Sequence, residues 1–369
     1  MQRRKFLRTA GVGSAAVAAS ATLAAPAIAQ SMPELKWRMT SSFPKSLDTL
    51  YGGAERLSRI VAEATDNKFQ IHVFAAGEIV PGLQVVDAVQ NGTVEMGQTA
   101  SYYYSGKDPA FALGTTVPFG LNTRQMNAWL TYGGGEQALN EFYKGYNIFG
   151  MVGGNTGTQM GGWFRKEIKS VDDLKGLKFR IGSVIAGQVM AKLGAVPQQI
   201  AGGDIYPALE KGTIDAAEWV GPYDDQKLGF NKIAPHYYYP GWWEGTAALH
   251  IFTGLEKWNS LPKNYQAIVR AACADTTTWV TAKYDAENPK ALRELVASGT
   301  QLHPFSPAIM DAAFAASNEV YKDTMAKSPA FKKIYESMTA FRRDEVLWFR
   351  VAENNYDNFM ARQSAANKL

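Results

Sequence analysis

Strand-like and helix-like stretches alternate along the N-terminal part of the chain, and this alternation is the strongest constraint on its fold. Residues 35–39 and 69–74 have the side-chain pattern of strands, and residues 50–64 between them carry apolar side chains at helical spacing. A second helix closed by Gly92 and a strand over residues 94–104 follow. Strands that alternate with helices form a mostly parallel sheet, where ligands bind beyond the carboxyl ends of the strands. The sequence therefore predicts an α/β protein.

A faint internal repeat predicts two lobes that are built alike. When the sequence is shifted by 120 positions, residues 88–95 align with residues 208–215, and both copies read as a helix, a glycine and a strand. The same shift places Gln98 opposite Glu218. This common arrangement could also have arisen twice, and in either case we expect similar halves.

The chain is predicted to cross twice between these lobes. The first crossing follows the strand that begins at Ile148, and the return lies near Ala247. Lobe 1 is expected to comprise residues 33–153 together with residues 247–305, and lobe 2 residues 154–246. Lobes joined in this way form a hinged cleft that closes on a ligand by rotation about a few residues.

Residues 306–369 are predicted to form long C-terminal helices with one apolar stripe. Apolar side chains recur at near-helical spacing from Ile334 to Phe359, over roughly seven turns. A stripe of this length exceeds what one small lobe can cover. It could pack on the core of its own chain or on a second copy of the chain.

Residues 1–29 are predicted to be a targeting segment that does not belong to the folded protein. Basic residues including the pair Arg3-Arg4 precede an Ala-rich stretch, and residues 27–29 form a small-x-small cleavage site. The arginine pair favours the twin-arginine export route over the general secretory route. The segment holds four basic and no acidic residues, so the remaining chain has 34 of each and no basic field for nucleic acid or a membrane surface.

The rest of the composition predicts an exported protein that its own core stabilises. Cys273 is the only cysteine, which excludes an intramolecular disulfide and a cysteine metal cluster. No later apolar run approaches the ~20 residues that a membrane-spanning helix needs. We therefore expect a protein that works outside the cytoplasm, in a periplasm, and is not embedded in the membrane.

Arg180 is the first candidate binding residue. It follows the apolar run of a predicted strand and precedes Gly182 and Ser183, so it lies at the end of that strand. A planar guanidinium in this position can hold a carboxylate through two parallel hydrogen bonds. The ordinary alternative for any arginine is an ion pair on the surface.

Two glutamates lie beside tryptophans and suggest a cation site. Glu218 directly precedes Trp219, and Glu244 directly follows Trp243. A buried carboxylate without a partner costs several kcal/mol, so a positive group is expected near each one if it is buried. As an alternative, both could be solvated acids on loops.

Three long stretches carry a resemblance to a known family. They are GGNTGTQMGGWFRKEI at residues 153–168, QQIAGGDIYPALEKGTIDAAEWVGPYDD at residues 198–225, and YYYPGWWEG at residues 237–245. These stretches resemble the substrate-binding subunits of TRAP transporters, the DctP-like extracytoplasmic solute receptors. The likeness covers essentially the whole chain and is greatest to the branch that binds 2-oxo acids.

The resemblance implies a two-lobe periplasmic solute-binding fold with mixed, mostly parallel sheets, an interlobe cleft and long C-terminal helices. It implies that Arg180 clamps the carboxylate of the substrate. It also implies that a metal ion touching the substrate is held by the side chains of Gln159, Glu218 and Glu244 and by the backbone carbonyl of Trp219. These oxygen donors suit sodium or calcium and exclude a typical zinc site. Charge neutrality favours calcium, the 2-oxo acid branch favours sodium, and we expect sodium.

The other pocket residues are expected from the same comparison. Asn155 would donate an amide hydrogen bond to the ligand, although a role in the turn is also open. Strand alternation sends Tyr103 to the face opposite Tyr102, and one of these faces should reach the cleft, with Tyr102 preferred. Three aromatic residues would form the apolar walls: Phe43, Trp219 and Trp243.

The predicted function is that of a receptor for a small 2-oxo monocarboxylate such as pyruvate or 2-oxobutyrate. It would bind this acid with a metal ion and deliver it to TRAP membrane subunits, and the family implies a homodimer through a long C-terminal helix. The same architecture could bind a 2-hydroxy acid such as lactate, or another organic acid. An exported α/β enzyme is a distant alternative, because the sequence contains no G-x-S-x-G elbow and its four histidines are scattered.

Overall fold

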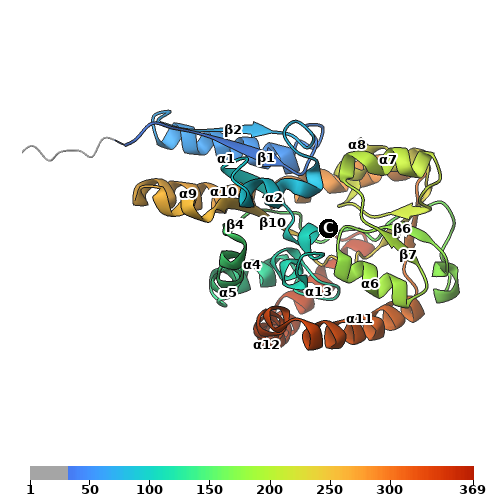
Figure 1. The fold of residues 1–369 in the computed structure, drawn as a ribbon. Helices are drawn as coiled ribbons and strands as arrows, with labels where there is room; N and C mark the ends of the chain where they lie inside the picture. The colour runs from blue at the N-terminus through green and yellow to red at the C-terminus, as the bar shows by residue number, and fades with distance from the viewer. Residues whose placement is uncertain (1–31) are drawn as a thin grey trace, which may run out of the picture. The chain divides into compact units, whose positions relative to one another are not determined.

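The computed structural model describes residues 32–369, so the predicted targeting segment lies outside the described residues. Two mixed β-sheets organise the described chain (Figure 1). The first sheet has the strand order β2-β1-β3-β10-β4 and the second the order β11-β9-β5-β8-β6-β7. In each sheet three neighbouring strands run parallel, β2-β1-β3 in the first and β8-β6-β7 in the second. The predicted two-lobe α/β architecture is confirmed.

The strands of the first sheet are β1 (Leu35–Ser41), β2 (Phe69–Phe74), β3 (Met96–Thr99), β4 (Ile148–Asn155) and β10 (Ala248–Gly254). The strands of the second sheet are β5 (Gly162–Phe164), β6 (Lys178–Arg180), β7 (Val196–Gln198), β8 (Ala216–Ala217), β9 (His236–Tyr239) and β11 (Gln301–Pro304). The helices up to the second sheet are α1 (Leu50–Ala64), α2 (Val85–Gln90), α3 (Ala112–Thr115), α4 (Thr123–Thr131) and α5 (Gly135–Tyr143). The later helices are α6 (Val184–Lys192), α7 (Gly202–Glu210), α8 (Pro222–Leu228), α9 (Leu255–Ser260), α10 (Lys263–Ala297), α11 (Pro307–Lys327), α12 (Pro329–Val351) and α13 (Glu353–Ala365).

The predicted alternation of strands and helices in the first lobe is present, with one correction. Helix α1 packs on β2 and α10, and Leu57 and Val61 are buried on that face. The strand predicted over residues 94–104 ends at Thr99, and residues 101–104 form a 3-10 helix. The chain turns there because Ser101 donates to the carbonyl of Phe111 (2.7 Å), a partner from the following segment that a continuing strand could not reach.

The chain passes from the first sheet to the second between Asn155 and Gly162, and returns between Tyr239 and Ala248. Helix α10 is 35 residues long and contacts β4 and α1 of the first lobe as well as α8. At about 1.5 Å per residue it is long enough to carry the chain from one sheet to the other. Strand β11, which follows it, pairs with β9 in the second sheet. The end of the segment 247–305, expected in lobe 1, therefore contributes to the second sheet.

The C-terminal helices use only the first part of their apolar stripe for packing on the chain itself. Helix α12 packs on α5 and α11, and Ile334 and Met338 are buried there. Farther along, the side chains of Trp348, Tyr356 and Phe359 are 57%, 64% and 50% exposed. Among residues 32–369, no helix combines the length and the apolar character that a membrane crossing requires.

Candidate functional site

The parallel pairing of β6 with β8 brings an arginine and a glutamate together at the carboxyl ends of these strands. Arg180 is opposite Ala217 in the register, so Glu218 is the next residue beyond the sheet edge. Arg180 Nη1 lies 2.5 Å from Glu218 Oε1 and 2.9 Å from the carbonyl oxygen of Glu218. The N–H of Gly182 donates to the same Oε1 atom (2.5 Å). The strand-end position predicted for Arg180 is confirmed, and its ordinary alternative, a surface ion pair, is not what the structure shows.

This ion pair is completely buried, with 1% of the Arg180 side chain and none of the Glu218 side chain exposed. Burial raises the pKa of the Glu218 carboxyl, and the charge of Arg180 opposes the rise. Burial would lower the pKa of the Arg180 guanidinium, but Glu218 outweighs that effect and the guanidinium stays charged. The guanidinium also lies over the Trp219 ring, 5.0 Å from its centroid.

The two segments that cross between the sheets, residues 156–161 and 240–247, are hydrogen-bonded to each other. The N–H of Gly241 donates to the carbonyl of Gln159 (2.9 Å), and the N–H of Gln159 donates to the carbonyl of Glu244 (3.2 Å). These backbone bonds hold the side chains of Gln159 and Glu244 near each other. The crossing segments thus form one side of the site. Arg180, at the end of β6, contributes to the same site.

Glu244 is a buried carboxylate with no ion-pair partner among the described residues. Burial, and then the charge of Glu218, raise the pKa of the Glu244 carboxyl well above its usual range, while Arg180 opposes the rise. Tyr102 and Gln159 lie close enough to lower this pKa in part, yet neither makes a hydrogen bond of good geometry to the carboxyl. A carboxylate in this environment requires a cation or a proton.

Several buried polar atoms at this place have no hydrogen-bond partner within the described chain. The acceptors among them are Gln159 Oε1, Glu218 Oε2 and both carboxylate oxygens of Glu244, and the donors are Asn155 Nδ2, Arg180 Nη2 and Trp219 Nε1. Buried polar groups are nearly always paired, so unpaired donors and acceptors gathered in one place indicate a ligand. Unpaired oxygen acceptors together with unpaired N–H donors suit a cation beside an anion.

The acceptor set fits the metal ion that the resemblance implied. It consists of carboxylate and amide oxygens without histidine or cysteine, which is the chemistry of sodium and calcium sites. Residues 32–369 hold no group of three or more His, Cys, Asp or Glu residues that could bind a metal. A site with only two carboxylates must therefore draw on neutral oxygens such as that of Gln159.

Asn155 has the turn role considered for it, and its role as a donor to the ligand stays a prediction. Its Oδ1 atom accepts hydrogen bonds from the N–H of Gly157 (2.9 Å) and the hydroxyl of Thr246 (2.7 Å), which fixes the turn between the sheets. Its Nδ2 atom has no partner among the described residues. The turn therefore aims one amide N–H group at the site.

A small cavity of about 10 Å³ lies between the lobes, and two residues of the unpaired set, Gln159 and Trp219, line it. A volume of this size is about that of one water molecule. The cavity is lined by Phe43, Leu50, Ala100, Tyr102, Tyr103, Thr156, Gln159, Trp219, Val220, Ala247 and Leu249. Phe43 and Trp219 meet edge to face across it, with ring centroids 6.3 Å apart.

Both tyrosines line the cavity, which differs from the expectation of opposite faces. In the 3-10 helix that replaces the expected strand, successive side chains are not sent to opposite sides as they are in a strand. Tyr102 packs against Gly182, where a Cβ atom would lie 2.7 Å from the tyrosine ring. Burial raises the pKa of Tyr103 to about 12, so its hydroxyl stays protonated.

Trp243 is not among the residues that line the small cavity, and its role as an apolar wall stays a prediction. Its ring packs on Phe179 (5.2 Å between centroids) and Phe305 (5.7 Å), and it is absent from the cavity lining. Neighbouring residues of a strand point to opposite faces, so a ring that packs on Phe179 is on the side of β6 away from Arg180. The structure therefore places Trp243 in the core of the second lobe.

Five apolar lining residues were missed by sequence analysis: Leu50, Ala100, Val220, Ala247 and Leu249. They follow the same apolar periodicity as residues of the core, so no local signal separates them from it. Only their position beside the cavity identifies them.

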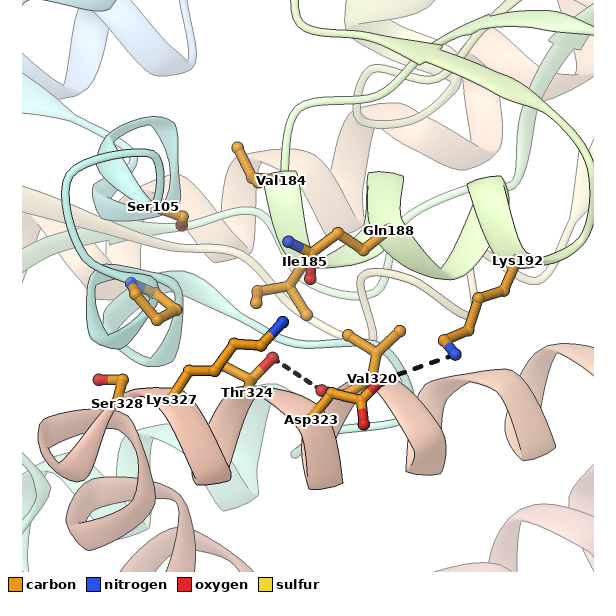
Figure 2. A pocket seen from close by; sticks show the side chains of 11 residues that line it. Ser105, Val184, Ile185, Gln188, Lys192, Val320, Asp323, Thr324, Lys327 and Ser328 are labelled. Carbon is orange, nitrogen blue, oxygen red and sulfur yellow. Dashed lines mark hydrogen bonds and ion pairs between the residues drawn. The ribbon is translucent and has the colours of Figure 1, made fainter.

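A larger cavity, of about 410 Å³, lies between α6, α11 and the segment after β3 (Figure 2). Two of its charged lining residues are paired, because Lys192 of α6 is 3.7 Å from Asp323 of α11, and Lys192 is also 3.0 Å from Glu319. None of its lining residues has a buried polar atom without a partner. The smaller cavity is therefore the better candidate site.

Several known proteins are similar to this chain in sequence and in fold. The model of one family, described as bacterial extracellular solute-binding protein, family 7, matches residues 40–328. A monocarboxylate 2-oxoacid-binding periplasmic protein of Nostoc sp. is 52% identical over 361 residues, which cover 97% of this chain and 99% of the relative.

Two solved structures are similar along their whole length. A TRAP transporter solute-binding protein from Bordetella bronchiseptica, a mixed-occupancy dimer with copurified calcium and picolinate, is 53% identical with a TM-score of 0.89, covering 91% of this chain and 99% of that chain. A TRAP periplasmic solute-binding protein from Pseudoalteromonas atlantica, with bound sodium and pyruvate, is 36% identical with a TM-score of 0.85, covering 88% and 99%.

Proposed function

Because this chain belongs to family 7 of the bacterial extracellular solute-binding proteins, we propose that it binds a small 2-oxo monocarboxylate such as pyruvate together with a metal ion, and delivers the acid to the membrane subunits of a TRAP transporter. Members of this family are receptors of transporters and not enzymes. They work outside the cytoplasm, and for this chain we propose the periplasm.

One observation carries the proposal, namely the set of buried donors and acceptors that have no partner among the described residues. Arg180 Nη2 and Asn155 Nδ2 can donate to the carboxylate of the ligand, while oxygens of Gln159, Glu218 and Glu244 can hold a cation. A cation bound there would supply positive charge for the oxygens of a 2-oxo acid. Charge-assisted hydrogen bonds are worth roughly 1.5–3 kcal/mol each. Two such bonds, from Arg180 and Asn155, would supply the largest polar part of the binding free energy of a ligand with micromolar affinity.

The aromatic walls favour a small ligand. Phe43, Trp219 and Tyr102 line the cavity, and such bulky side chains beside the polar groups leave little room for a ligand. A C3 acid such as pyruvate meets this requirement better than a sugar acid or a long dicarboxylate.

For the metal we propose sodium rather than calcium. The bound sodium in the pyruvate-binding relative from Pseudoalteromonas atlantica supports this choice, and the calcium in the relative from Bordetella bronchiseptica opposes it. Two glutamates, one arginine and a monocarboxylate sum to a charge of −2, so sodium leaves one negative charge and calcium leaves none. The test is calorimetry with pyruvate in sodium buffer, in sodium-free buffer, and in chelator-treated buffer with calcium restored.

We further propose a homodimer through the C-terminal helices. The exposed apolar side chains of Trp348, Tyr356 and Phe359 support it, as does the dimer of the relative from Bordetella bronchiseptica. A second copy that covers these side chains would complete the apolar stripe that the chain's own core leaves open.

The proposed function is tested with a panel of C3 to C6 acids that includes pyruvate, 2-oxobutyrate and lactate. A ligand that binds only the folded state stabilises it by RT ln(1 + [L]/Kd), so pyruvate should raise the melting temperature in a concentration-dependent way. Preference for lactate would identify a 2-hydroxy acid receptor instead. The absence of any shift with every acid of the panel would contradict the proposal.

A further inference from the structure

On the premise of the function proposed above, we propose that Leu50 and Leu249 form the end wall that limits the chain length of the bound 2-oxo acid. Both residues line the cavity, and both are almost completely buried. Neither belongs to the polar set that would hold the carboxylate and the metal ion.

The direction of the ligand follows from how polar and apolar groups are divided. The unpaired donors and acceptors belong to the end of β4, to the crossing segments and to the second sheet, at Asn155, Gln159, Arg180, Glu218 and Glu244. The carboxylate and 2-oxo groups of the ligand must therefore face these residues.

The alkyl end must then face the apolar part of the lining. This part includes Leu50 and Ala100 of the first lobe, Ala247 at the end of a crossing segment, and Leu249 of β10. Two of them are alanines, which are short, so the leucines are the larger side chains of this group. They decide how many carbons fit beyond the 2-oxo group.

Leu249 has little room to recede. It lies on β10 where the register with β4 shifts, between Ala248, which is opposite Asn155, and His250, which is opposite Val152 of β4 and Thr99 of β3. Its Cδ1 atom would lie 3.1 Å from a Cβ atom at Gly154, so the β4 backbone packs directly behind it. A longer ligand therefore meets a fixed side chain.

Leu50 is held by a buried hydrogen-bond network at the start of α1. Its carbonyl oxygen accepts from Gln98 Nε2 (2.7 Å), and Gln98 Oε1 accepts from the hydroxyl of Ser41 (2.7 Å). All three residues are buried, so displacing Leu50 would break bonds that water cannot replace. This side of the cavity is as rigid as the side formed by β10.

The test compares wild-type protein with Leu249→Ala and Leu50→Ala, using pyruvate, 2-oxobutyrate, 2-oxopentanoate and 2-oxo-4-methylpentanoate in calorimetry. One methylene group in an apolar pocket changes affinity by about 10- to 200-fold. Each variant should bind pyruvate less tightly and 2-oxo-4-methylpentanoate more tightly, so the ratio of the two dissociation constants should shift by at least about 10-fold. Leu249→Phe should shift the ratio in the opposite direction.

Leu57→Ala is the matched control. Leu57 is a buried leucine of the same helix as Leu50 but does not line the cavity, so its removal should lower stability and leave the ratio unchanged. If a Leu→Ala variant does not fold, Leu249→Val and Leu50→Val make the same comparison with a smaller change.

Two outcomes are distinguishable. Pyruvate binding that persists while the ratio stays constant in all Leu249 and Leu50 variants would overturn the end-wall proposal and leave the receptor function intact. Failure of the wild-type protein to bind any 2-oxo acid would instead remove the proposed function on which the end wall rests.

Discussion

The Arg180–Glu218 pair shows how one residue can serve both structure and binding. Moving both charges from water into the core is costly, and the direct contact at 2.5 Å recovers part of that cost. Arg180 also donates from Nε to the carbonyl of Ile200 (3.0 Å), which leaves Nη2 as its unpaired nitrogen. The guanidinium is thus fixed by the protein before a ligand arrives.

We predict that Arg180→Lys weakens pyruvate binding by about 10- to 100-fold, because an ammonium group cannot keep the Glu218 contact and donate a second, parallel bond to the ligand. Calorimetry measures the change. Arg38→Lys, in a surface pair with Glu95 (3.0 Å), is the control and should bind normally. Equal binding by both variants would mean that Arg180 does not hold the ligand.

We predict that Asp224 makes the folded state less stable as the pH rises, which is the opposite of the usual effect of a carboxyl group. Burial raises the pKa of Asp224 to about 7, although Tyr284 donates a hydrogen bond to it (2.6 Å) and partly opposes the rise. The folded state therefore prefers the protonated acid. Its stabilising contribution is complete below pH ~4, the unfolded pKa, and is lost as the pH rises from there to about 7.

Asp224→Asn imitates the protonated acid and should remove this dependence. The shift corresponds to at most about 4 kcal/mol, so the variant should be more stable than wild type at pH 7 and similar at pH 4. Urea unfolding at several pH values measures the difference. A stability difference that does not change between pH 4 and pH 7 would contradict the assignment.

Substitution of the neighbouring Asp225 by asparagine should have the opposite effect on stability at pH 7. Its oxygens accept from Trp163 Nε1 (2.9 Å), from the Tyr237 hydroxyl (2.7 Å) and from the N–H groups of Val220 and Gly221. In the asparagine variant, the side-chain amide N–H group would face one of these donors and could not accept its hydrogen bond. Asp225→Asn should therefore destabilise the protein by about 1–3 kcal/mol at pH 7 in the same unfolding experiment.

At the scale of elements, the segment between β1 and α1 is tied to α8 and α10 by one carboxylate. Asp48 forms ion pairs with Lys227 of α8 and with Lys283 of α10 (2.7 Å), and accepts from the hydroxyl of Tyr223 (3.0 Å). Burial would raise the pKa of Asp48, but the bonds from Lys227 and Lys283 outweigh it and lower the pKa to about 2. The cluster joins segments that follow strands of different sheets.

We predict that Asp48→Asn lowers the stability at pH 7 by about 1 kcal/mol, a modest value because 49% of the Asp48 side chain is exposed. The contribution of the lowered pKa is present above the unfolded pKa of ~3.9 and is lost as the pH falls to about 2. Thermal melts at low and high salt measure it, and salt should reduce the difference. A difference that persists at pH 2 would contradict the ion-pair origin.

At the scale of the whole molecule, the C-terminal helices should determine the oligomeric state. We predict that the mature protein sediments as a dimer and that Trp348→Asp shifts it toward a monomer with little loss of stability, because that side chain is 57% exposed in the single chain. Tyr132→Asp, at another exposed aromatic residue, is the control. A wild-type monomer at micromolar concentration would contradict the dimer.

Local pattern alone was enough to predict much of the fold. The periodicity of α1 and the strand over residues 69–74 both appear as expected, because each depends on neighbours within a few residues. The membership of β11 in the second sheet could not be predicted in this way. It depends on where the 35-residue helix α10 delivers the chain, which is a property of long-range packing.

The sequence by itself also determined that Arg180 ends a strand and that two glutamates lie beside tryptophans. Only the tertiary structure decided that Trp243 packs on Phe179, that both Tyr102 and Tyr103 reach the cavity, and that Leu249 lines it. The physical reason is that apolar periodicity identifies the buried face of an element but carries no information about what is buried against it. Whether an apolar side chain meets more core or a bound acid depends on the partner that the other lobe supplies.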